Sequence, residues 1–186
     1  MLLGGVLLIA FTEPTLRSVG FAVALALVGA GNGLLVSQLG NVIMSSVSSE
    51  RSSEVGGLQG TAQNLGASLG TALVGSMLIA ALVGNFQQAV LANPALANIR
   101  DELVTVAEEK ANFVSTEQLR GAAEAAGLST QQIDALVADY ENAQIVALKA
   151  AFAVGVLFAL IALWYVRRLP AAAQAGEPAA PMPGPA

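Results

Sequence analysis

The sequence predicts an all-α integral membrane protein, because long stretches of the chain carry no charge at all. Residues 18–49 and 55–99 contain no Asp, Glu, Lys or Arg, and residues 142–166 contain only Lys149. Hydrophobic residues make up 55% of the chain and charged residues only 11%, which favours a membrane protein over a globular one. Since about 20 apolar residues cross the hydrocarbon core of a bilayer, each stretch is long enough to span it.

The first apolar segment, residues 1–11, is too short to cross a bilayer. It lacks the basic region and the small-residue cleavage site of a signal peptide. We expect it to be the second half of a truncated N-terminal helix, with a short interfacial or re-entrant segment as the alternative. Residues 16–45 then form the first full transmembrane helix.

The rest of the chain alternates between polar and apolar segments. Residues 46–54 form a short polar connection, and residues 55–83 form the second transmembrane helix. Residues 84–142 are too polar to lie in lipid, and residues 143–168 form the last transmembrane helix. The remaining residues, 169–186, are rich in Pro, Ala and Gly and are expected to be a disordered cytoplasmic tail.

The flanking residues of the last span predict the orientation of the chain. Arg167 and Arg168 follow this span directly, so the positive-inside rule places the C-terminus in the cytoplasm. Trp164 and Tyr165 then lie at the inner interface, where such amphipathic rings are favoured. This orientation makes residues 84–142 an extracytoplasmic insertion of a multi-pass protein in the plasma (inner) membrane.

The insertion at 84–142 carries helical signals of its own. Apolar residues recur at helical spacing after Pro94; they are Leu96, Ile99, Leu103 and Val106. Ser115 with Gln118 and Ser129 with Gln132 have the spacing of capping boxes, and Gly127 between them is typical of a helix C-cap. No helix breaker lies between residues 131 and 168. We expect either a small helical cap on the outer side or a solvated spacer.

Small residues four positions apart occur repeatedly in the first two full spans, and such pairs let neighbouring helices approach closely in lipid. The positions that we assign to helix packing are Gly29, Gly33, Gly56, Gly60, Gly66, Gly70 and Gly75. On the second span, Leu58, Leu65 and Leu69 form a separate stripe that we expect to face lipid.

Amide side chains inside the predicted spans are the candidate functional residues, because polar groups in hydrocarbon are costly. Those placed to line a pathway or to bond between helices are Asn32, Gln38, Gln63 and Asn64. Interhelical hydrogen bonding is the simpler interpretation for any one of them. No Asp or Glu lies deep in a span, so a proton-coupling carboxylate is not expected within this chain.

The composition argues against enzymatic and nucleic-acid functions. The chain has no Cys, which rules out disulfides, thiolate metal sites and a Cys nucleophile, and no His, which removes the commonest general base and metal ligand. We predict no catalytic residue, no metal site and no cofactor. Residues 85–142 supply the net negative charge, and the chain has no basic face for a nucleic acid.

Three motifs in order resemble the C-terminal end of a major facilitator superfamily transporter, most closely the fourteen-helix drug:proton antiporters. They are Gly29-Ala-Gly-Asn-Gly33, Ser48-Ser-Glu-Arg51, and the second span with its Leu65-Gly66-x-x-x-Gly70 pattern. Many members of this group also have an enlarged outer loop before the last helix. The resemblance is specific over residues 29–83 and extends to the rest only by layout.

The resemblance implies proton-coupled antiport of small hydrophobic or cationic substrates by alternating access. The chain would contribute the last spans, and its partners would be the lipid bilayer and the missing N-terminal helices of the same transporter. The inner connection has Ser-Ser where relatives often have prolines. The alternative is a non-transporting membrane scaffold or accessory subunit, whose outer helical domain binds a partner.

Overall fold

The computed structural model describes residues 1–13, 18–45, 47–109 and 113–168. All regular structure within these ranges is helical, as the sequence predicts. The predicted tail at 169–186 lies outside the described residues, as do the first two residues of the predicted first span, 16 and 17.

Among the described residues, three helices are long and apolar enough to cross a membrane, which indicates a membrane-embedded chain. These helices are α2 (Val19–Ser45), α3 (Ser52–Ala92) and α6 (Thr130–Val166). A shorter apolar helix, α1 (Leu2–Phe11), precedes them. With 41 residues α3 is about 60 Å long, twice the roughly 30 Å of a hydrocarbon core. Helix α3 is therefore longer than a single crossing of a hydrocarbon core requires.

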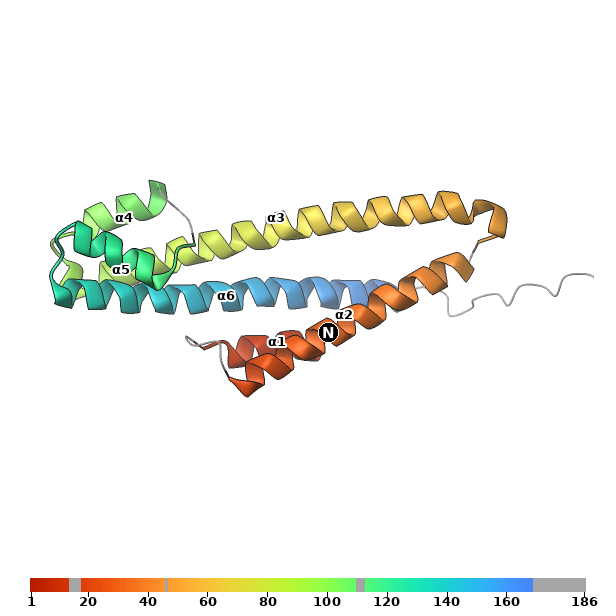
Figure 1. Ribbon diagram of the computed structural model, residues 1–186, viewed down its shortest axis with the longest axis horizontal. Helices are drawn as coiled ribbons and strands as arrows, with labels where there is room; N and C mark the ends of the chain where they lie inside the picture. Colours follow the sequence, from red (N-terminus) through yellow and green to blue (C-terminus); the bar gives the residue numbers. More distant parts are fainter. Residues whose placement is uncertain (14–17, 46, 110–112, 169–186) are drawn as a thin grey trace, which may run out of the picture.

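Helices α3 and α6 run antiparallel and side by side, and they are the framework of the molecule (Figure 1). Helix α1 packs against both α2 and α6, whereas α2 makes few contacts with α3. The short 3₁₀ helix η1 (Ser49–Arg51) joins α2 to α3 at one end of the framework. We call this end the turn end.

The pairing of α1 with α2 depends on a close approach at Gly4. A Cβ atom at Gly4 would lie 2.8 Å from the backbone nitrogen of Val28 and 2.9 Å from the carbonyl oxygen of Ala24. Gly4 and Ala24 are both buried. Because both clashing atoms are backbone atoms of α2, only glycine fits at this crossing.

The opposite end of the framework carries the other helices: η2 (Pro94–Leu96), α4 (Arg100–Glu109) and α5 (Thr116–Ala125). They fold back onto the ends of α3 and α6 (Figure 1). We call this part, residues 82–109 and 113–147, the cap.

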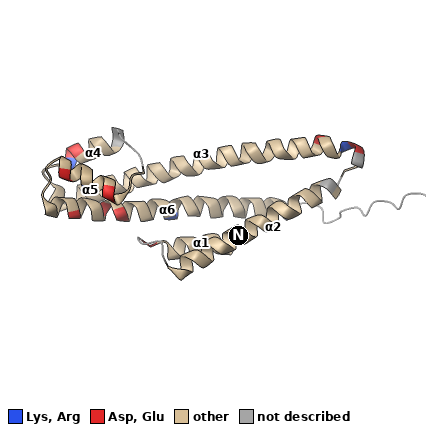
Figure 2. Ribbon diagram, viewed as in Figure 1, with Lys and Arg blue, Asp and Glu red and all other residues tan. Residues whose placement is uncertain are grey.

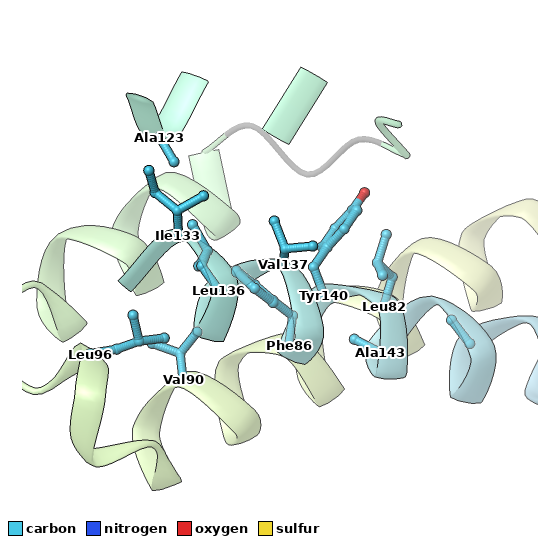
Figure 3. Packing of buried hydrophobic residues seen from close by; sticks show 11 residues of the cluster. Leu82, Phe86, Val90, Leu96, Ala123, Ile133, Leu136, Val137, Tyr140 and Ala143 are labelled. Atoms are coloured by element: carbon cyan, nitrogen blue, oxygen red, sulfur yellow. The ribbon is translucent and has the colours of Figure 1, made fainter. Parts of the chain in front are cut away.

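The cap has a hydrophobic core to which α3, η2, α5 and α6 all contribute (Figure 3). The rings of Phe86 and Tyr140 meet edge to face at its centre, with centroids 5.6 Å apart. Around them lie the other buried core residues, Leu82, Val90, Leu96, Ala123, Ile133, Leu136, Val137, Ala143 and Ala147. Residues 84–109 and 113–142 thus pack with α3 and α6 into a helical unit with a hydrophobic core, unlike a solvated spacer.

The local helix signals predicted for this region are confirmed. Ser115 and Ser129 each accept a hydrogen bond from the backbone of the residue three positions on, and both capping boxes are complete. Gly127 has a φ of 77°, which is the left-handed conformation of a C-cap. Helix α6 continues without a break to Val166.

Several helix boundaries differ from the predicted ones: α3 begins at Ser52 and not at residue 55, and α6 begins at Thr130 and not at residue 143. Helix α3 passes the predicted end at residue 83 and continues to Ala92, because apolar residues beyond it pack into the cap core. After Pro94 the regular α-helix starts only at Arg100. The preceding turn is 3₁₀ because the side chain of Asn93 accepts a hydrogen bond from the backbone N–H of Ala95.

Two glycines of the cap should respond in opposite ways to alanine. Gly127→Ala forces a Cβ into the left-handed region and should destabilise the cap by about 1–2 kcal/mol. Gly121→Ala lies inside α5 with open space around it and should stabilise the cap by up to about 1 kcal/mol. Hydrogen exchange of the α5 and α6 amides measures both changes. Equal effects of the two variants would contradict the C-cap assignment.

Candidate functional site

The four candidate amide side chains all lie exposed on the two spans that are least covered. Asn32 and Gln38 are on α2, and Gln63 and Asn64 are on α3. Within the part of the chain that the structure describes, no hydrogen bond joins them to one another or to a third residue. The chain alone therefore leaves these amides unsatisfied wherever they face hydrocarbon.

Most of the predicted packing glycines have the same uncovered surroundings. A Cβ added at Gly29 or Gly33 on α2 would meet nothing within 4 Å. The same holds for four glycines of α3, namely Gly60, Gly66, Gly70 and Gly75. Gly56, near the start of α3, is half-buried. These positions leave room for a further helix that the described chain does not supply.

The predicted leucine stripe of α3 is equally exposed. Leu58, Leu65 and Leu69 are 70%, 59% and 63% exposed, and all residues from 61 to 69 are exposed. Val74, further along α3, is half-buried and lines a cavity together with residues of α1, α2 and α6.

An apolar cavity of about 250 Å³ lies in the cap. Its walls come from α3, α4, α5 and α6, with Leu82, Phe86, Leu103 and Leu119 among the lining residues. Tyr140 also lines this cavity. Its hydroxyl accepts a hydrogen bond from the N–H of Val114 at 3.0 Å and donates one to the Val114 carbonyl at 3.2 Å. These two bonds hold the residue that precedes the N-cap of α5. The Gln144 side chain donates to the same carbonyl.

A second apolar cavity, of about 230 Å³, lies where α1, α2, α3 and α6 meet. Its lining includes Leu2, Val28, Val74 and Phe152 and contains no polar side chain. This space lies between the spans and is not shaped for a polar or charged ligand.

Charged residues gather in the cap and at the turn end, with few between them (Figure 2). Lys149 is half-buried on α6, close to the cap. Arg120 and Asp134 form a 3.0 Å ion pair in the cap, but both side chains are exposed, so the pair stabilises the fold little. Arg168 stacks over Trp164 at 3.8 Å near the other end of α6, as expected for an interfacial anchor.

Two residues with clear structural roles, Gly4 and Tyr140, were not predicted from the sequence. Gly4 is followed directly by Gly5 in an apolar run, and neither glycine has a second small residue four positions away. Tyr140 lies in a polar segment, where its only signal is that it is an aromatic residue at helical spacing from Ile133, Leu136 and Val137.

Comparison of the chain with family models, with curated proteins and with solved structures finds no match.

Proposed function

We propose that this chain forms the C-terminal part of a secondary active efflux transporter of the major facilitator type. One observation carries the proposal: the two spans α2 and α3 expose amides and glycines along faces that no described residue covers. Polar groups in hydrocarbon are costly unless other helices or a water-filled pathway meet them. Further transmembrane helices packed on α2 and α3 would give the amides hydrogen-bonding partners and would fill the space beside the glycines.

The motifs at residues 29–33, 48–51 and 65–70 support the identity of those further helices. In the proposed transporter they come from its N-terminal part, which also supplies the carboxylates for proton coupling. The small-residue faces of α2 and α3 are the surfaces along which the two groups of helices rock during alternating access. Substrates are small hydrophobic or cationic molecules.

We propose further that the C-terminus is cytoplasmic and that the cap lies outside a plasma membrane. Arg167 and Arg168, next to Trp164 and Tyr165, support this orientation. The turn end, with Glu50 and Arg51, is then on the cytoplasmic side.

Single-cysteine labelling tests the orientation, because the natural chain has no Cys. A thiol introduced by Ser115→Cys, exposed in the cap, should react with an impermeant maleimide on intact cells. A thiol introduced by Ser48→Cys, exposed at the turn end, should react only after permeabilisation. The reverse pattern would overturn the orientation.

Dye flux tests the transport function. In vesicles, the chain alone should self-associate and move no cationic dye, because its amide faces remain uncovered. The chain produced together with the N-terminal helices of such a transporter should move the dye in exchange for protons that flow down their gradient in the opposite direction. If the chain is a stable monomer, moves no dye, and behaves the same with and without the N-terminal helices, the scaffold function would be favoured instead. Flux by the chain alone would contradict the need for further helices.

A further inference from the structure

The cavity of the cap has a buried floor and an open mouth. Its floor consists of Leu82, Phe86 and Tyr140, which are only 2%, 8% and 5% exposed. Its mouth lies between α4 and α5, where Val106 is 44% exposed and Ala122 is also exposed. With about 250 Å³ of space, the cavity is a pocket that a molecule can enter from outside.

The lining of the pocket excludes charged ligands. Nine of its eleven lining residues are apolar, and none carries a charge. The hydroxyl of Tyr140 is already hydrogen-bonded to the backbone of Val114, and Oε1 of Gln118 accepts from the backbone N–H of Ser115. A charged ligand would lose its hydration here, and the neutral NH2 group of Gln118 is too little to replace it.

We propose that the cap binds a small uncharged aromatic molecule in this pocket. Apolar cavities of about 150 Å³ stay free of water and take up benzene, so this larger pocket suits a molecule of one or two fused rings. Phe86 and Tyr140 meet edge to face and offer aromatic surface to such a ring. The binding does not depend on transport, because every wall of the pocket belongs to the cap.

A lipid chain is a poorer occupant than an aromatic molecule. Helices α4 and α5, which flank the mouth, carry exposed acidic residues, among them Asp101, Glu102 and Glu117. These carboxylates repel the phosphate of a lipid headgroup. The mouth thus favours a neutral solute that arrives from water.

Protection of a thiol at the mouth tests the proposal in the whole chain, reconstituted in nanodiscs. Indole is the probe, and N-ethylmaleimide is the labelling reagent. At an indole concentration ten times its Kd, labelling of the thiol introduced by Ala122→Cys should slow about tenfold, since only free pockets react. Labelling after Ala125→Cys should not change, because this exposed residue of the same helix does not line the pocket.

A second substitution shows where the probe binds. Adding Ala107→Phe, which fills the pocket from α4, should abolish the protection at position 122. If that variant perturbs the cap, Val106→Phe at the exposed mouth blocks entry instead. Three results would overturn the proposal: indole gives no protection at position 122, indole slows labelling equally at positions 122 and 125, or its protection persists in both the Ala107→Phe and the Val106→Phe variants.

Discussion

Leucine at Gly66 or Gly70 is expected to abolish assembly of this chain with further transmembrane helices, while the chain's own helices tolerate it. A side chain added at either glycine meets no atom of the described chain within 4 Å, so the substitution causes no internal clash. In lipid, close helix approach at small residues is a main source of association. A leucine side chain in such a contact overpacks it and weakens assembly by about 1–3 kcal/mol. Substituting both glycines weakens assembly further.

Two sets of variants make this prediction specific. Leu65→Ala and Leu69→Ala, on neighbouring positions of α3, should leave assembly nearly unchanged if the leucine stripe faces lipid. Gly4→Ala should instead disturb the chain itself, because it clashes with the α2 backbone. The measurement is the fraction of chain co-purified with the partner helices. Equal recovery of the glycine and leucine variants of α3 would refute the face assignment.

Leu136→Ala is expected to loosen the whole cap. Leu136 is 2% exposed and lies in the core between α3 and α6. Removing a buried leucine side chain costs about 2–5 kcal/mol, because its contacts are lost and a cavity remains. That loss is a large fraction of the roughly 5–15 kcal/mol by which a domain is stable. Amide hydrogen exchange in α5 and in the first turns of α6 should therefore rise steeply.

Leu91→Ala is the matched control, since Leu91 lies on α3 within the cap but is 50% exposed. Its effect should be within about 0.5 kcal/mol, as for most surface substitutions. Similar exchange in both variants would mean that the cap core contributes little to its order. Dye flux should fall only with Leu136→Ala if the cap supports transport.

The helices of this chain could be predicted because their signals are local. Charge-free stretches define the spans, and the caps at Ser115, Ser129 and Gly127 are set by a few neighbouring residues. The packed cap could not be separated from a spacer by sequence alone. Its core includes Leu82, which is predicted to lie in a span. It also includes Phe86, whose ring partner Tyr140 lies about fifty residues further along the chain.

The candidate site could be predicted only as a set of residues, not as an arrangement. The amides at Asn32, Gln38, Gln63 and Asn64 stand out because polar groups are rare in hydrocarbon. Their partners do not follow from the pattern, and the described chain supplies none. The aromatic pocket of the cap was not predicted either, because its walls come from four helices brought together by the fold.

The uninterrupted course of α6 links what happens inside the bilayer to the far side of the molecule. With 37 residues and no break, α6 is a rod about 55 Å long. Tilting such a rod by about 10° displaces one end relative to the other by about 10 Å. Any rocking of α6 among its neighbours in the membrane would carry α5 and the cap core with it, because they are packed on the same rod. The position of the cap therefore reports the tilt of α6.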